Sequence, residues 1–386
     1  MTIPLTAALR AALRDELEAA RSLRRRLHAA PRVSGDEADT TAQVVDALGA
    51  GPGLEIAGTG RVVLVGTGTP ARGCIALRAE LDALPVTETT GVSWAATGDA
   101  MHACGHDVHL AATVAACRAI ARVDSPVSVA ALLQPREETA PSGARDIVAS
   151  GLLAELGVRA VVGAHVQPQV DAGRIAVTAG LVNASVDEFE ITVHGSGGHA
   201  GYPHTVRDPV VALASIVINL QQIAARRIDP VHGAVCVVGG LSAGTATNVV
   251  PSTAHAFGSL RLMRTEDRER AAKELVEIVE ASAIAYGCRA DVRLSDGEPA
   301  LLNDPALAQA ATAVLRAEGY AVVDDFRSFG ADDFAHYGER LPALMLFVGV
   351  DGGAGLHDPR FLPPEDAVDM VADALIAGYV AAAAQP

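Results

Sequence analysis

Residues 109–133 read HLAATVAACRAIARVDSPVSVAALL, and this stretch decides the fold class. Residues 109–121 follow a helical pattern, and residues 127–133 form an apolar run with β-branched valines, directly after Pro126. An apolar run that follows a proline is typical of a buried strand. A helix followed closely by such a strand is the unit from which α/β sheets are built.

The same alternation continues on both sides of this stretch. Residues 5–27 predict an amphipathic helix, because Leu9, Leu13 and Leu17 recur every fourth residue, and a second helix is expected after the turn at residues 34–37. The other elements are apolar runs at 62–65, 74–77, 160–166 and 344–350, and a helical pattern at 144–156. Strands alternating with helices predict an α/β sheet that is covered on both faces.

The pattern changes near Ala184. Strands are expected at residues 189–194, 234–238, 254–262 and 290–294, and helices at residues 209–225 and 266–286. The order β-α-β-β-α-β makes a compact sandwich by itself. We therefore predict an inserted domain at residues 184–295 and a first domain formed by residues 1–183 and 296–386.

Charge and cysteine usage restrict the partners and the compartment. The 386 residues carry a formal net charge of −16, which argues against nucleic acid and anionic membranes, because both attract basic surfaces. Arg10 and Arg14 interrupt the N-terminal region, so a signal peptide is not expected, and no uninterrupted apolar stretch reaches the length of a membrane span. The 5 cysteines lack the spacing of a disulfide framework. A reducing compartment, the cytoplasm, is therefore expected.

The densest group of candidate ligands is residues 102–109, HACGHDVH, at the start of the predicted helix. Thiolate and imidazole are good ligands for zinc and related borderline metals. The alternative is a polar loop in which Asp107 caps the helix. A redox role for Cys104 is disfavoured because no second cysteine is nearby.

A pair of carboxylates follows the strand at residues 127–133, within QPREE at residues 134–138. Enzymes of the α/β class place their sites at the C-terminal ends of strands. Adjacent side chains point in different directions, so one carboxylate could bind a metal while the other accepts a proton from the reacting water. The alternative is a solvated, charged turn.

Two single histidines are further candidates. His165 lies within an apolar run, where a histidine is more often a hydrogen-bonded core residue. His357 lies in the loop after the strand at residues 344–350, and an ordinary exposed histidine is the alternative for it. Because these residues and the two groups above lie at or beyond strand ends of one predicted sheet, we expect them to converge at one sheet edge.

The inserted domain contains two glycine-containing turns. GSGGHAG at residues 195–201 could let the backbone and the His199 imidazole approach a ligand, although a simple hairpin turn is the alternative. GTATNVVP at residues 244–251 contains Asn248, and Arg261 lies on the following strand. Asparagine and arginine could hold a substrate carboxylate, and a surface salt bridge is the alternative for Arg261.

Taken in order, these motifs resemble the aminoacylase and hippurate-hydrolase branch of the dinuclear metallopeptidase superfamily, which includes N-acyl amino acid amidohydrolases and plant auxin-conjugate hydrolases. The resemblance runs from RRRLH at residues 24–28 to the final helix. Its motifs are LDALP at 81–85, MHACGHD at 101–107, QPREE at 134–138, GGH at 197–199, NVVP at 248–251 and LHDP at 356–359. It implies a zinc-peptidase-like catalytic domain with a mixed sheet covered by helices, and an inserted lid and dimerisation domain.

The resemblance also implies residue roles. Two divalent ions, zinc or manganese with cobalt or nickel as options, would be held by Cys104, His106, Glu138, His165 and His357. Glu137 would be the general base and acid, and His199 would polarise the scissile carbonyl in the neighbouring subunit of a homodimer. Asn248 and Arg261 would contact the carboxylate side of the substrate, and Asp82 would orient a metal ligand.

The implied reaction is hydrolysis of the amide bond of an N-acyl amino acid or a related small amide. A dipeptidase, carboxypeptidase or desuccinylase of the same superfamily is one alternative, and a metal-dependent binding protein without catalysis is another. Cys104, the expected bridging thiolate, stands where those peptidase branches have aspartate, and the presence of both Glu137 and Glu138 argues against simple binding. Three positions depart from the branch: Glu80 replaces its usual aspartate, Leu81 its usual methionine and Arg136 its usual alanine.

Overall fold

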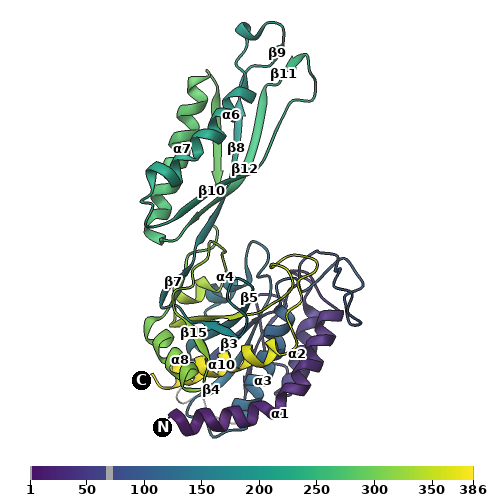
Figure 1. Cartoon of the computed structure of the whole chain (residues 1–386). Coiled ribbons are helices and arrows are strands. Elements are labelled where there is room, and N and C mark those ends of the chain that lie inside the picture. Colours follow the sequence, from purple (N-terminus) through teal and green to yellow (C-terminus); the bar gives the residue numbers. More distant parts are fainter. Residues whose placement is uncertain (1, 67–72, 386) are drawn as a thin grey trace. The chain divides into compact units, whose positions relative to one another are not determined.

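The computed structural model describes residues 2–66 and 73–385, and within them the chain forms two compact units. The first unit comprises Met1–Gly180, Leu302–Arg327 and Asp333–Pro386, and the second comprises Leu181–Leu301 and Ser328–Asp332. Each unit has a hydrophobic core of its own. Figure 1 labels their helices and strands.

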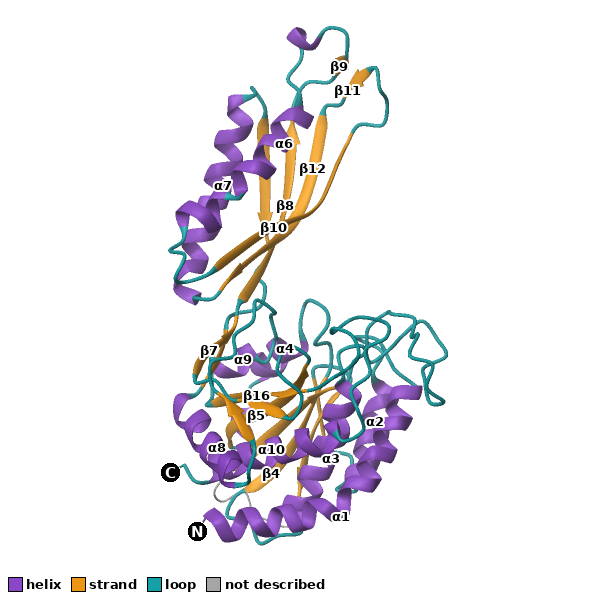
Figure 2. Cartoon of the chain, in the orientation of Figure 1, coloured by secondary structure: helices purple, strands orange, loops and turns teal. Residues whose placement is uncertain are grey.

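A mixed, eight-stranded sheet forms the centre of the first unit (Figure 2). Its order is β1 (Leu54–Ile56), β2 (Gly60–Val65), β4 (Ser128–Gln134), β3 (Cys74–Glu80), β5 (Val158–Gln167), β16 (Ala343–Gly349), β6 (Arg174–Ala176) and β15 (Ala321–Val323). The four central strands β4, β3, β5 and β16 are parallel, whereas β2 and β6 pair antiparallel with this group. Every residue of β3 and β16 is buried, which requires cover on both faces of the sheet. The α/β class predicted from the sequence is confirmed.

The helices of the first unit cover this sheet. They are α1 (Thr2–Ala29), α2 (Ala38–Leu48), α3 (His106–Ala121), α4 (Gly143–Ser150), α5 (Leu152–Glu155), α8 (Pro305–Ala317), α9 (Ala335–Gly338) and α10 (Ala367–Ala383). α1, α3 and α10 share one core with the sheet, in which Leu23, Leu110 and Leu375 are buried. The single helix predicted at residues 144–156 is wrong: Gly151 has a φ of 75°, a left-handed conformation that ends α4 before α5 begins.

An antiparallel, four-stranded sheet of order β10-β12-β8-β13 forms the second unit. Along the chain its elements are β8 (Ser185–His194), α6 (Pro209–Leu220), β10 (Ala234–Ala243), β12 (Thr253–Leu262), α7 (Arg268–Ala285) and β13 (Arg289–Leu294). This is the β-α-β-β-α-β order expected from the sequence. Alternate residues Phe189, Ile191 and Val193 of β8 are buried in the core with residues of α6 and α7. The helix expected at residues 209–225 ends at Leu220 and is followed by a π-helical turn, η3 (Ile223–Arg227).

Short elements complete the described structure. β9 (Gly198–His199) pairs with β11 (Val249–Val250), and β7 (Gly180–Asn183) pairs with β14 (Leu301–Asn303). Two single turns of 3-10 helix are η2 (Pro203–Thr205) and η4 (Thr265–Asp267). No helix within the described residues combines the length and the apolar character that crossing a membrane demands.

Candidate metal centre

Parallel strands bring residues that are distant in the sequence to one edge of the first unit's sheet. Glu80, the last residue of β3, is paired with Gln134, the last residue of β4. On the neighbouring pair, His165 of β5 is in register with Phe347 of β16. The remaining candidates lie in the loops that follow these strands and around the start of α3. The C-terminal edge of such a sheet is where α/β proteins bind ligands.

All five side chains expected to bind metal gather at this edge. Cys104 Sγ lies 3.5 Å from His165 Nε2, and Glu138 Oε1 lies 3.3 Å from His357 Nε2. One ligand atom from each of Cys104, His106 and Glu138 lies within 4.8 Å of the others. A thiol, imidazoles and a carboxylate at these separations form a donor set that suits borderline divalent metals.

The two buried imidazoles are oriented by backbone carbonyl groups. His106 Nδ1 donates to the Asp82 carbonyl oxygen at 2.8 Å, and His165 Nδ1 donates to the Val166 carbonyl oxygen at 2.6 Å. Because a carbonyl oxygen only accepts, Nδ1 of each ring carries a proton, which leaves Nε2 as the nitrogen that can bind a cation. Among the described residues, His106 Nε2 and Glu138 Oε1 are buried acceptors without a hydrogen-bond partner. Buried atoms of this kind, grouped with a thiol, can bind a cation, so the residues fit a metal site.

Two further residues, Glu80 and His109, join this cluster, and the residue roles inferred from the sequence did not include them. Glu80, His106, His109 and His165 form a second group of closely spaced ligand atoms. His109 Nδ1 donates to Glu80 Oε2 at 2.9 Å, while the Val166 N–H donates to His109 Nε2 at 2.9 Å. Both ring nitrogens of His109 are therefore engaged, and this residue supports the segment that carries His165. The sequence signal that could have identified His109 is its spacing of three residues from His106, which places both on one side of the helix.

Glu80 itself is charged although it is buried. Burial alone would raise the pKa of Glu80, but Arg78 and His109 hold it well below the ordinary value. The Arg78 guanidinium contacts Glu80 directly and also donates to Gln134 Oε1 at 2.8 Å. The aspartate-to-glutamate departure at this position thus lengthens a carboxylate that reaches both the arginine and His109.

Protonation within the cluster is governed by burial and by the nearby carboxylates. Burial raises the pKa of the Cys104 thiol well above its usual range, and Glu138 and Glu137 raise it further. Burial lowers the pKa of His165 well below its usual range, so its imidazole is neutral. Neutral imidazole is the form that binds metal, whereas the thiol has to lose its proton when a cation binds.

Glu137 precedes Glu138 in the chain, and Asp82 bonds to the Glu138 backbone. Glu137 Oε2 is 3.8 Å from His106 Nε2, and its side chain is 11% exposed, so solvent reaches it. Asp82 is fully buried, and its Oδ2 accepts from the Glu138 N–H at 2.9 Å and from Ser34 Oγ at 2.7 Å. Asp82 therefore holds the Glu138 backbone while its own carbonyl oxygen orients His106, which is the geometry of a residue that orients ligands.

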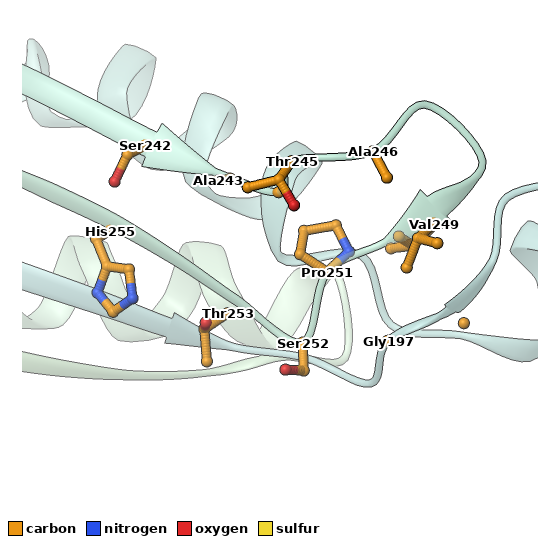
Figure 3. A pocket seen from close by; sticks show the side chains of 13 residues that line it. Gly197, Ser242, Ala243, Thr245, Ala246, Val249, Pro251, Ser252, Thr253 and His255 are labelled. Carbon is orange, nitrogen blue, oxygen red and sulfur yellow. The ribbon is translucent and has the colours of Figure 1, made fainter.

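The second unit brings His199 and Asn248 together. His199 of β9 is in register with Val249 of β11, and the Ala200 N–H donates to the Asn248 carbonyl oxygen at 3.0 Å. An open cavity of about 700 Å³ adjoins this pair of strands, and Val249 and Pro251 are part of its lining (Figure 3). His199 and Asn248 do not themselves line this cavity, although their chain neighbours Gly198 and Val249 do.

Arg261 lies elsewhere in the second unit. It is at the opposite end of β12 from Thr253, which lines the cavity. Its Nη1 donates to the Phe329 carbonyl oxygen at 2.7 Å. Within this unit, the structure does not bring Arg261 to His199 and Asn248.

The α/β fold and the buried thiol, imidazole and carboxylate cluster are those of a metal-dependent hydrolase. Residues 76–377 match the model of the family described as Peptidase family M20/M25/M40, and the chain belongs to this family. It is therefore a metal-dependent amidohydrolase, an enzyme that cleaves amide bonds.

The relatives and the solved structure that follow match most of the chain. An N-acetylcysteine deacetylase of Bacillus subtilis (strain 168) is 34% identical over 358 residues, which cover 90% of this chain and 92% of that protein. An N-acetyldiaminopimelate deacetylase of Shouchella clausii (strain KSM-K16) is 34% identical over 305 residues, covering 78% and 81%. A crystal structure of a dinuclear metal-binding peptidase of the M20 family from Bacillus subtilis superposes with a TM-score of 0.82 at 30% identity, covering 95% of this chain and 98% of that one.

Proposed function

We propose that this enzyme hydrolyses the amide bond of N-acyl amino acids, and that its substrates carry small acyl groups such as acetyl. The observation that carries the proposal is the pair of buried acceptors, His106 Nε2 and Glu138 Oε1, beside the Cys104 thiol. Two relatives that match most of the chain are named as deacetylases of N-acetylated amino acids, which supports this substrate class.

Two divalent ions would occupy the cluster. Their ligands would be Cys104, His106, Glu138, His165 and His357. The mixture of thiolate, imidazole and carboxylate suits zinc or manganese, with cobalt or nickel as further options. When bound, the ions would supply Lewis acidity, polarising the scissile carbonyl and lowering the pKa of the attacking water.

Glu137 is the proposed general base and acid. Its carboxylate stands beside the ligand atoms, 3.8 Å from His106 Nε2, and remains accessible to solvent water. It would accept the proton of the water that attacks the amide carbon and then deliver that proton to the leaving amine. Asp82 would keep the neighbouring Glu138 in place through the 2.9 Å bond to its backbone N–H.

The second unit would supply substrate contacts. His199 would act in the site of the neighbouring subunit of a homodimer, where it would stabilise the oxygen of the scissile carbonyl as negative charge develops on it. Asn248 would contact the carboxylate side of the substrate. The pairing of β9 with β11 supports these roles, because the residue after His199 donates its N–H to the Asn248 carbonyl oxygen. Arg261 would bind the substrate carboxylate only after giving up its bond to the Phe329 carbonyl oxygen.

Two copies of the chain would associate through the second unit. β10 is an edge strand of its sheet, and Val237, Leu241 and Phe257 expose apolar side chains on β10 and the adjacent β12. An exposed strand edge with apolar neighbours is a favourable surface for pairing with another chain. The five cysteines are free and buried, which supports a cytoplasmic location.

An amine-release assay tests the proposal. Protein reconstituted with zinc or with manganese is offered N-acetyl and longer N-acyl amino acids, and dipeptides with a free amino group. Release from the N-acetyl compounds by the wild type, and its loss in Glu137→Gln with bound metal retained, is the expected result. Preferred cleavage of dipeptides would replace the substrate class with a peptidase specificity. Metal binding without turnover of any compound would favour a binding protein.

A further inference from the structure

The turn that carries Glu137 has an unusual backbone conformation. Arg136 has a φ of 52°, which lies in the left-handed region that non-glycine residues rarely adopt. This residue directly precedes Glu137 and follows Pro135, the first residue after β4. A side chain in that conformation stays there only when its surroundings hold it.

A buried carboxylate stabilises this conformation of Arg136. Glu37, which immediately precedes α2, is fully buried. Its Oε1 accepts from the Arg136 N–H at 3.0 Å and from the Gly35 N–H at 2.7 Å, and its Oε2 accepts from Thr59 Oγ1 at 2.7 Å. A carboxylate with three donors is fully satisfied and rigid, so it fixes the position of the Arg136 peptide group.

The rest of Arg136 is anchored as well. The Gly143 N–H donates to the Arg136 carbonyl oxygen at 3.0 Å. The Arg136 guanidinium donates to the Pro141 carbonyl oxygen at 2.8 Å and to Asp146 Oδ2 at 2.5 Å. The side chain that replaces the usual alanine of this branch therefore ties the turn to α4 and the loop before it.

Two carboxylates thus bond to the backbone on either side of the proposed base. The peptide N–H before Glu137 is held by Glu37, and the peptide N–H after it is held by Asp82. We infer that Glu37 is a positioning residue for Glu137: its carboxylate keeps Arg136 left-handed and thereby aims the Glu137 side chain at the reacting water. The inference rests on the proposed role of Glu137, and Glu37 itself touches no metal ligand.

Graded substitutions test this assignment. Glu37→Ala removes the acceptor, and Glu37→Asp keeps the charge but withdraws the carboxylate from the Arg136 N–H. Misplacing the base lowers kcat by about 10- to 100-fold and changes KM little, since substrate contacts are elsewhere. Glu37→Gln keeps one oxygen that can accept from both N–H groups, so this variant is expected to retain most of the wild-type kcat. Bound metal, measured by mass spectrometry, is expected to stay near the wild-type content in all three.

Asp304 offers a matched control for simple loss of stability. It is also a carboxylate that accepts two backbone N–H groups, from Ala306 and Leu307 at 2.9 Å. Its own N–H donates to the carbonyl oxygen of Ala343, the first residue of β16, at the sheet edge opposite the metal centre. Asp304→Ala is expected to lower the melting temperature and leave kcat unchanged.

A second substitution separates positioning from folding. Glycine reaches a φ near 52° without steric cost, so Arg136→Gly should recover part of the kcat that Glu37→Ala loses. A general loss of stability would instead lower the melting temperature and leave kcat unchanged, as expected for Asp304→Ala. Unchanged kcat in Glu37→Ala and Glu37→Asp, with Glu137→Gln inactive, would overturn the positioning role alone. Should Glu37→Ala fail to fold, Glu37→Asp with and without Arg136→Gly gives the same comparison. Full activity of Glu137→Gln would instead refute the proposed base.

Discussion

The Sγ atom of Cys104 lies 3.5 Å from the Nε2 atom of His165, although 61 residues separate the two along the chain. Cys104 belongs to the loop before α3, and His165 lies on β5. Their contact places a thiol and a neutral imidazole where one cation can bind both. Because burial keeps the thiol protonated, the contact also links metal binding to proton release.

Metal affinity should therefore increase with pH. Binding of zinc to the metal-free protein is expected to release a proton from Cys104, since the raised pKa of this thiol keeps it protonated near neutrality. Calorimetric titrations in two buffers of different ionisation enthalpy measure the number of protons released. Cys104→Ser should release about one proton fewer, because a serine hydroxyl stays protonated. Equal release by wild type and variant would contradict this prediction.

The two adjacent carboxylates should behave differently when each is replaced. Glu137→Gln is expected to lower kcat by roughly 10²–10⁴-fold while bound metal is retained, because a general base contributes about that much. Glu138→Gln should instead lose metal, since its Oε1 lies among the ligand atoms of Cys104 and His106. Metal content and single-turnover rates of both variants check the distinction. Loss of metal in Glu137→Gln would place that side chain among the ligands.

Gly143 should tolerate no side chain. A Cβ atom there would lie 1.8 Å from the Pro135 carbonyl oxygen, next to the turn that carries Glu137. Gly143→Ala is expected to lower the free energy of unfolding by about 1–3 kcal/mol and to reduce kcat as the turn shifts. Gly98→Ala is the control, because a Cβ at Gly98 meets no atom within 4 Å. Urea unfolding and kcat measurements on both variants compare the two sites, and equal behaviour would argue against close packing here.

His28 should make the free energy of unfolding depend on pH. Its Nδ1 and Nε2 bond to Asp107 at 3.0 Å and to Glu88 at 3.1 Å, and Arg24 and His102 are the other charged or titratable groups close by. Burial alone would lower the pKa of His28, but the two carboxylates raise it above the ordinary value of 6.5.

The direction of this effect follows from proton binding. A raised pKa means that the folded chain holds the His28 proton more tightly than the unfolded chain does. The stabilisation is complete below pH 6.5 and is lost as the pH rises through the folded-state pKa. His28→Gln should remove this alkaline decline. Urea unfolding of the metal-free protein from about pH 6 to about pH 9 measures it, and parallel curves for wild type and variant would exclude His28 as the source.

Much of the fold could be predicted from local patterns in the sequence. Apolar runs, most of them near glycine or proline, identified β4, β5 and β16, because a strand buried on both faces is apolar over most of its length. The change of pattern after residue 184 anticipated the order of elements in the second unit. The helix at residues 144–156 was wrong because one left-handed glycine, Gly151, outweighed its helical pattern.

The candidate site could be predicted only in part from local patterns in the sequence. Strand ends indicated that Cys104, Glu138 and His165 would meet, since parallel strands end at one edge. Nothing local shows that His109 has both ring nitrogens engaged or that Glu37 reaches the Arg136 peptide group. These roles depend on hydrogen bonds between segments far apart in the chain.

By itself, the sequence determined the fold class, the two element patterns and the set of chemically able side chains. Hydrophobic period and turn residues are local properties, and they act over a few neighbouring positions. Only the tertiary structure decided which histidines keep a free lone pair and which carboxylate holds the turn before Glu137. Those outcomes depend on distances of about 3 Å between elements, and such distances arise only when the chain packs.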